Sequence, residues 1–246
     1  NKVVQGGALA VLHDIPTGIA GMIMTDPPFF INIGRTEGEA GMGHDPWSDI
    51  SSTEAAIAWA RPLMLEFARV VRKGGAVVVM ASTQSGAALV LAAEEAGLVW
   101  MNEITVLWNS GKPRARNFGS LFTRILWFVT PGARHQWNSR HRSIYSNVLV
   151  CDKVPINHRQ HPAQKPIELT TFLISLLSHK TDLIVDPFCG SGSTLVSAAI
   201  CGRPFVGIDK EPMYVKVAAR RSMQFETEAE NEGEIYLWIN GRLDPI

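Results

Sequence analysis

Short apolar runs alternate with longer amphipathic segments along most of this sequence. Runs of strand length occupy positions 21–24, 76–80, 99–108, 183–186 and 204–209. Apolar residues recur at helical spacing in segments 53–72, 86–96, 167–179 and 195–201. Strands that alternate with helices predict an α/β fold, in which a doubly wound, largely parallel sheet is covered by helices on both faces. We expect a single domain that spans residues 1–246.

Local signals mark where two of the predicted helices begin and end. Ser52 is a preferred N-cap residue for the helix at 53–72, and Gly74-Gly75 is placed to end that helix. Pro166 has the position of a helix-opening proline for the segment 167–179, because its missing N–H would be unpaired there in any case.

Three of the apolar runs end in, or lead into, an acidic residue. Asp26 follows the first run, Asp186 ends the run at 183–186, and Asp209 ends the run at 204–209. In a doubly wound sheet, ligands bind at the carboxyl ends of the strands. We therefore expect a ligand site at that edge, where Asp209 has the position of a carboxylate that binds the ribose of an adenosine ligand.

The turn Thr25-Asp26-Pro27-Pro28-Phe29-Phe30 combines a carboxylate, two rigid residues and an aromatic side chain. Neither proline can donate to a sheet ladder and both fix φ, so the strand stops here and the loop is stiff. Such a turn can accept two hydrogen bonds from an exocyclic NH2 group, one on Asp26 and one on a backbone carbonyl, while Phe29 stacks on the ring. A plain strand-ending proline turn is the alternative.

A glycine-rich turn follows the strand that ends at Asp186. Residues 187–194 read Pro-Phe-Cys-Gly-Ser-Gly-Ser-Thr and lead into the helical segment 195–201. Gly190 and Gly192 allow a ligand to approach the backbone closely, and the amides that begin a helix favour an anion. The dinucleotide fingerprint requires a glycine at Leu195 and the phosphate loop requires Gly-Lys-Ser/Thr, so neither of these motifs is complete.

Composition is that of a globular protein with a large core. The chain has 246 residues, of which 46% are hydrophobic, and 23 basic and 23 acidic residues give no net charge. We find no apolar stretch of membrane-spanning length and no signal-peptide core, and therefore expect no membrane contact and a cytoplasmic location. The three cysteines form no CxxC pair, so we expect neither disulfides nor a metal site.

The neutral balance hides a basic segment. Positions 104–151 contain no Asp or Glu. The basic residues within it are Lys112, Arg114, Arg116, Arg124, Arg134, Arg140 and Arg142. The aromatic residues among them are Trp108, Phe118, Phe122, Trp127, Phe128, Trp137 and Tyr145. Basic residues interleaved with aromatic ones predict a nucleic-acid-binding surface, although Trp127 and Phe128 lie in a strand-like run and are assigned to the core. The acidic stretch at 226–234 is expected to be a solvated linker.

Four motifs together resemble the beta group of amino-methylating DNA methyltransferases. In chain order they are Asp26-Pro-Pro-Phe, His161-Pro-Ala-Gln-Lys-Pro166, Asp186-Pro-Phe-Cys-Gly-Ser-Gly-Ser-Thr and Gly207-Ile-Asp. The catalytic motif comes first and the cofactor motifs come last, which is the permuted order of that group. The resemblance covers about residues 5–222 and implies a seven-stranded sheet of the Rossmann-like methyltransferase type. It also implies S-adenosyl-L-methionine as cofactor and double-stranded DNA as partner, with a homodimer left open.

The resemblance assigns roles to individual residues. Those implied in catalysis are Asp26, Pro27, Pro28 and Phe29. Those implied in cofactor binding are Lys165, Asp186, Phe188, Gly190, Gly192 and Asp209, with Phe188 beside the methyl-bearing sulfur and Lys165 near the methionine carboxylate. A short recognition region is expected at about 109–159, and its DNA-binding residues are Lys112, Arg114, Arg116, Arg140 and Arg142.

The resemblance favours N6 of adenine as the methylated atom, because the family's cytosine-N4 members usually carry Ser where this chain has Asp26. Methylation of cytosine N4 is the first alternative. An RNA or protein amine methyltransferase and a non-catalytic nucleic-acid-binding subunit are the others. One departure from the family pattern stands near the start, where relatives usually have Gly-Asp and this chain has Gly6-Gly7. That acid commonly meets the cofactor's adenine, so we expect weaker cofactor binding here.

Overall fold

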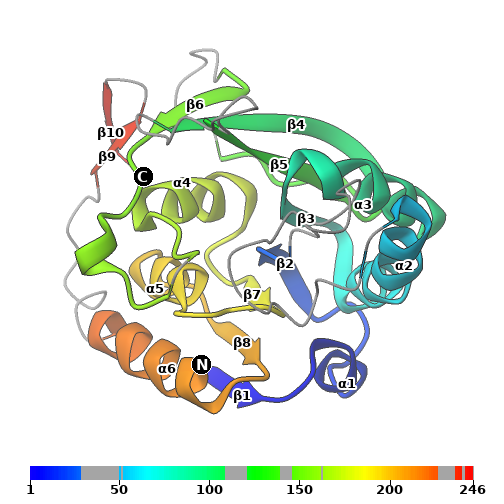
Figure 1. Cartoon of the computed structure of the whole chain (residues 1–246), viewed down its shortest axis with the longest axis horizontal. Coiled ribbons are helices and arrows are strands. Elements are labelled where there is room, and N and C mark those ends of the chain that lie inside the picture. Colours follow the sequence, from blue (N-terminus) through cyan, green and yellow to red (C-terminus); the bar gives the residue numbers. More distant parts are fainter. Residues whose placement is uncertain are drawn as a thin grey trace, which may run out of the picture.

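A computed structural model describes residues 1–28, 50, 52–108, 121–138, 146–161, 163–226, 236–239 and 242–245. Its main feature is a mixed sheet, whose strand order is β1-β8-β7-β2-β3-β5-β4-β6 (Figure 1). The strands are β1 (Lys2–Gln5), β2 (Ala20–Thr25), β3 (Val71–Ala81), β4 (Val99–Trp108), β5 (Phe122–Val129), β6 (Val148–Cys151), β7 (Leu183–Asp186) and β8 (Phe205–Asp209). Every neighbouring pair is parallel except those that β5 makes with β3 and β4. The predicted α/β fold with a largely parallel sheet is confirmed.

Helices cover both faces of this sheet (Figure 1). One face carries α1 (Ala8–His13), α2 (Thr53–Val70) and α3 (Thr83–Glu95), and the other carries α4 (Ile167–Leu177), α5 (Ser193–Ile200) and α6 (Pro212–Glu226). A short 3-10 turn lies at Ile156–His158, and β9 (Tyr236–Ile239) pairs with β10 (Arg242–Pro245) in a separate antiparallel hairpin. Within the described ranges, no helix has both the length and the apolar character needed to cross a bilayer.

The central strands are mainly apolar because both of their faces are covered. In β2, Met22 and Met24 belong to the core cluster that includes Leu173 of α4, whereas Ile23 belongs to the cluster that includes Phe67 of α2. Side chains alternate between the faces of a strand, so a continuous apolar run is what a strand buried on both sides requires.

The region around Gly74-Gly75 differs from the sequence-based prediction. Ser52 caps α2 as expected, since its Oγ accepts a hydrogen bond from Ala55 N at 3.1 Å. The helix ends at Val70, however, and β3 begins directly at Val71, so the two glycines lie inside a strand. Gly74 has a φ of 71°, and a Cβ at Gly75 would lie 2.7 Å from the Gly21 carbonyl oxygen. The glycines therefore serve the irregular start of the β2–β3 pairing and do not cap the helix.

The number of strands also differs from the prediction. Among the described residues the main sheet has eight strands, one more than the seven implied by the resemblance. The additional strand is β6, which falls in the expected recognition region and pairs in parallel with the end of β4. Leu149 in the middle of β6 is buried in the core, which explains why this short segment adds to the sheet.

Candidate active site

The three acidic residues singled out in the sequence meet at one edge of the sheet. Asp26 follows β2, Asp186 ends β7 and Asp209 ends β8. These strands are neighbours in the order β8-β7-β2 and run parallel, so their carboxyl ends coincide. A direct link joins two of them, because Thr25 Oγ1 donates to Asp186 Oδ1 at 2.8 Å. The predicted ligand edge is therefore the place where these carboxylates gather.

Asp26 forms an ion pair with Lys165. The Lys165 ammonium donates to Asp26 Oδ2 and also to the Ala163 carbonyl oxygen, the latter at 3.2 Å. Only 12% of the lysine side chain and 21% of the aspartate side chain are exposed. Asp26 Oδ1 is buried and has no hydrogen-bond partner among the described residues. Pro27 and Pro28 follow outside any helix or strand, as expected, and Phe29 lies outside the described residues.

Asp186 lies deeper in the same edge. It is 3% exposed, and its Oδ1 accepts hydrogen bonds from Thr25 Oγ1 and, at 3.1 Å, from Phe188 N. Burial raises the pKa of Asp186 to about 6, although hydrogen bonds from Thr194 and Thr25 favour the charged form. Removal from water disfavours the carboxylate, so Asp186 is a charge that a cationic ligand group would stabilise.

The glycine-rich turn connects β7 to α5 through two left-handed residues. Gly190 and Gly192 have φ values of 49° and 80°. A Cβ at Gly192 would lie 2.9 Å from the Cα of Ala218 in α6, so the glycine permits that helix to pack against the turn. Arg221 of α6 donates to the Ser191 carbonyl oxygen at 2.5 Å and fixes the turn from the same side. The backbone at Gly190 and Gly192 thus has the shape that close approach of a ligand requires.

Asp209 is oriented by backbone amides. Its Oδ2 accepts from Gly190 N and its Oδ1 accepts from Glu211 N, both at 2.9 Å. Each carboxylate oxygen can accept a second hydrogen bond, so the diol of a ribose could still be bound. The amide of Gly6, just after β1, donates to the Asp209 carbonyl oxygen at 3.0 Å.

His161 lies beside the acidic edge, which its place in a motif alone did not predict. Its ring contacts Tyr214 edge-on with centroids 4.4 Å apart, and a Cβ at Gly190 would lie 3.6 Å from His161 Cδ2. Burial lowers the pKa of His161 below its ordinary value, although Asp209 and Asp26 act in the opposite direction. Nδ1 accepts from Ala163 N at 3.1 Å, which assigns the proton of the neutral ring to Nε2.

Aromatic rings from two elements meet beside the glycine-rich turn. Phe188 lies 5.9 Å from Trp59 of α2, measured between ring centroids, with the planes tilted by 37°. Both side chains pack against the core cluster on the α2 face. Phe188 therefore has a fixed position near Asp186, as a residue beside a reacting group would need. The sequence-based prediction did not single out Trp59, because it is one apolar residue among many on α2.

The predicted DNA-binding surface is corrected at two positions. Arg124 is paired with Glu103, with Nη2 and Oε2 2.5 Å apart, so its charge is already neutralised. Trp108 is 9% exposed and donates from Nε1 to Thr123 Oγ1 at 3.0 Å, which places it in the core. Trp127 and Phe128 are buried as expected. The residues Lys112, Arg114, Arg116, Arg140 and Arg142 lie outside the described part of the chain.

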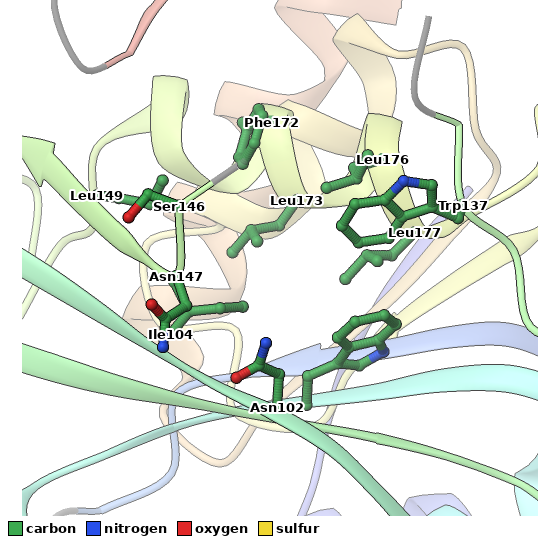
Figure 2. A pocket seen from close by; sticks show the side chains of 11 residues that line it. Asn102, Ile104, Trp137, Ser146, Asn147, Leu149, Phe172, Leu173, Leu176 and Leu177 are labelled. Atoms are coloured by element: carbon green, nitrogen blue, oxygen red, sulfur yellow. The ribbon is translucent and has the colours of Figure 1, made fainter. Parts of the chain in front are cut away.

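A separate pocket lies between α4 and the β4–β6 side of the sheet. Figure 2 shows Phe172, Leu173 and Leu176 of α4 opposite Asn102 and Ile104 of β4. Its lining is mostly apolar and contains no acidic or basic side chain among the described residues. It shares no residue with the acidic edge. No group of three potential metal ligands occurs in the described residues either.

The arrangement at the acidic edge can bind a nucleoside and hold an amine. Asp209 and the glycine-rich turn are suited to bind a ribose and the groups attached to it, and the buried carboxyl of Asp186 is suited to face a cation. Asp26 offers an acceptor oxygen that no described residue occupies.

Comparisons with known proteins agree with this geometry. Residues 20–220 match the N6/N4 methyltransferase family model, described as DNA methylase. The type II methyltransferase M2.DpnII of Streptococcus pneumoniae is 31% identical over 231 residues, which cover 86% of this chain and 83% of that protein. The DNA adenine methyltransferase YhdJ of Escherichia coli is 25% identical, with 89% of this chain and 81% of YhdJ covered. The crystal structure of the M1.HpyAVI–SAM complex has a similar fold, with a TM-score of 0.69, 24% identity and coverage of 89% of this chain and 98% of that one.

Proposed function

Because this chain belongs to the N6/N4 DNA methylase family, we propose that it transfers the methyl group of S-adenosylmethionine to N6 of adenine in double-stranded DNA. The observation that carries the proposal is the state of Asp26. Lys165 holds one of its carboxylate oxygens, and the other is buried without a partner in the described part of the chain. A buried acceptor without a donor costs about 1–3 kcal/mol, so an N–H group of the substrate would relieve a penalty already present.

The residues at the end of β2 would increase the low reactivity of the target amine. The lone pair of an exocyclic amine is delocalised into the base, which makes the amine a poor nucleophile. Asp26 Oδ1 and the Pro27 carbonyl oxygen would accept its two N–H groups and stabilise the positive charge that develops on the nitrogen. The stiffness of the Asp-Pro-Pro turn keeps both acceptors aimed, and fixed orientation is a large part of catalysis in such reactions. The base would leave the duplex and stack on Phe29.

The cofactor would occupy the turn between β7 and α5. S-adenosylmethionine supplies an electrophilic methyl group when it is bound. Asp209 would accept hydrogen bonds from the ribose hydroxyls, and Asp186 would face the positively charged amino group of the methionine half. Gly190 and Gly192 would allow the chain to approach it, with the ring of Phe188 beside the sulfur. These assignments agree with the roles that the sequence implied for the four motifs.

Nucleoside analysis of DNA treated with the purified protein tests the proposal. We expect N6-methyladenine in the wild-type reaction, and a loss of at least about 100-fold in Asp26→Ala, because acceptors of developing charge are typically worth that much. Calorimetry should show nearly unchanged S-adenosylmethionine affinity in the variant, since Asp26 acts on the amine. N4-methylcytosine in place of N6-methyladenine would overturn the choice of base. More than a tenth of wild-type turnover in Asp26→Ala would overturn the role of Asp26.

The choice of adenine rests on the acid at position 26 and on the adenine specificity in the name of the relative YhdJ. Both bases present an exocyclic amine beside a ring nitrogen, so the hydrogen bonds at Asp26 do not discriminate between them. The same assay with structured RNA and with protein tests the other substrate classes. Binding of DNA without any transfer would identify a non-catalytic subunit.

The partner and the location complete the proposal. Duplex DNA is the substrate form, and the cytoplasm of a bacterial, archaeal or phage-infected cell is where such DNA is accessible. We propose that the protein forms a homodimer. Sedimentation at several protein concentrations would test this.

A further inference from the structure

We propose that Lys165 is a positioning residue for methyl transfer: its ammonium holds Oδ2 of Asp26, so that Oδ1 stays oriented toward the target amine. The inference rests on the proposed reaction at Asp26. It gives Lys165 a role that differs from the one the resemblance implied, in which the lysine lies near the methionine carboxylate of the cofactor.

The contact itself is the first argument. A carboxylate has two equivalent oxygens and can rotate about its Cβ–Cγ bond, so an acceptor for one particular N–H must be held from the other side. Lys165 bonds Oδ2, and Oδ1 is left buried and unpaired among the described residues. Both side chains are mostly removed from solvent, which strengthens the pair relative to an exposed one.

The attachment of Lys165 to the fold is the second argument. Ser193 Oγ, at the start of α5, donates to the Lys165 carbonyl oxygen at 2.9 Å. Pro166 follows as the N-cap residue of α4 with φ fixed at −60°. The backbone of Lys165 is thus held between two helices, one of which begins directly after the glycine-rich turn. A displacement of that turn would be transmitted to the side chain that orients Asp26.

The charges around Asp26 are the third argument. Asp186 interacts unfavourably with Asp26 from the neighbouring strand, and partial burial lowers the pKa of the His161 ring. Asp209 is a further acid that faces His161. Among the described residues of this cluster, Lys165 is the cation that directly contacts Asp26. The ammonium therefore offsets the repulsion between the two carboxylates and holds the Asp26 side chain in place.

The experiment compares Lys165→Met, Lys165→Arg and the control Lys180→Met, which removes an exposed lysine elsewhere on the surface. Turnover and KM on DNA and S-adenosylmethionine affinity by calorimetry are measured for each. In Lys165→Met we expect a kcat at least about tenfold lower, with less than about threefold change in the KM for DNA and in cofactor affinity, because a positioning residue acts on the reacting geometry and not on binding. Lys165→Arg should restore part of the turnover, because it keeps the cation.

The possible outcomes separate this inference from the proposed function. A wild-type protein without methyl transfer refutes the proposed function, and the inference with it. Wild-type transfer with a kcat in Lys165→Met within about threefold of the wild-type value overturns the inference alone. About tenfold weaker cofactor binding in Lys165→Met, with an unchanged kcat, would assign Lys165 to the methionine carboxylate. If Lys165→Met does not fold, Lys165→Gln carries the same comparison, and the thermal unfolding of each variant verifies its fold.

Discussion

At the scale of single residues, the site is made of three carboxylates whose neighbours give them three different states. Asp26 is paired with a lysine, Asp186 is buried with a raised pKa, and Asp209 is held by two backbone amides. Under the proposed function, the same chemical group would therefore accept from an amine, face a cation and bind a diol within one site. The strands bring the acids together, and their different contacts suit each acid to a different proposed role.

The raised pKa of Asp186 predicts a pH dependence of cofactor binding. A bound cation would stabilise the charged carboxylate, so the complex binds fewer protons at Asp186 than the free protein does. S-adenosylmethionine affinity should therefore be constant above the free-protein pKa of about 6 and fall as pH decreases below it, at first by up to about tenfold per pH unit. Calorimetry between pH 5 and pH 8 would measure this. The variant Asp186→Asn should bind more weakly at all these pH values and lose the dependence; a wild-type affinity that is flat from pH 5 to pH 8 would contradict the assignment.

The acidic residues of the site were predictable from the sequence, and their partners were not. Asp26, Asp186 and Asp209 each end or follow an apolar run of strand length, so the topology of the sheet alone places them together. The ion pair between Asp26 and Lys165 joins residues 139 positions apart in the chain. No local pattern specifies such a contact. The resemblance to known motifs instead implied that Lys165 lies near the methionine carboxylate of the cofactor.

Among the secondary-structure elements, the proposed site is formed by the ends of strands and by the turn that leads into α5. The turn after β7 needs left-handed glycines, and the turn after β2 needs prolines, so both were visible as motifs. Boundaries were less predictable. Gly74-Gly75 has the composition of a helix end, but the register of β3 against β2 uses the pair inside a strand. The edge strands β1 and β6 are only four residues long. Whether so short a segment forms a strand depends on the strand with which it pairs.

The N-cap position of α1 allows the proposed adenine contact to be tested by substitution. Gly7 is the N-cap residue of this helix, has a φ of −70° and makes no side-chain cap hydrogen bond. A Cβ there would meet nothing within 4 Å, so an aspartate can be introduced without strain. Gly7→Asp should restore the acid that the family usually carries after β1. One additional hydrogen bond to the cofactor's adenine is worth about 0.5–1.5 kcal/mol, so S-adenosylmethionine affinity should rise by roughly threefold to tenfold.

Calorimetry on Gly7→Asp and on Gly7→Ala separates the side-chain acceptor from a backbone effect. The free energy of unfolding should change by only a few tenths of a kcal/mol in Gly7→Asp, because glycine is already a tolerated cap. Equal cofactor affinity in the aspartate and alanine variants would show that position 7 does not meet the adenine.

For the molecule as a whole, part of the positive charge of the described residues is already engaged by acidic side chains. The arginines at positions 61, 69, 72 and 124 are all paired with an Asp or Glu partner. A protein that binds duplex DNA must neutralise phosphates, and paired arginines contribute little to that. Segment 104–151, which contains basic residues and no Asp or Glu, is therefore the first region in which to test for phosphate contacts.

The last prediction follows from that charge distribution. Replacement of Arg114, Arg116, Arg140 and Arg142 by alanine should weaken DNA binding and reduce its dependence on salt, because each phosphate contact contributes about 0.9 to the slope of log K against log salt concentration. If all four contact phosphates, the slope should fall by roughly 3–4. Arg61→Ala is the matched control, since that arginine is engaged by Glu95 between α2 and α3 and should leave the slope unchanged. S-adenosylmethionine affinity should be the same in all these variants, because the proposed cofactor site lies at the ends of β7 and β8. An unaltered slope in the quadruple variant would show that DNA is bound by another surface of the molecule.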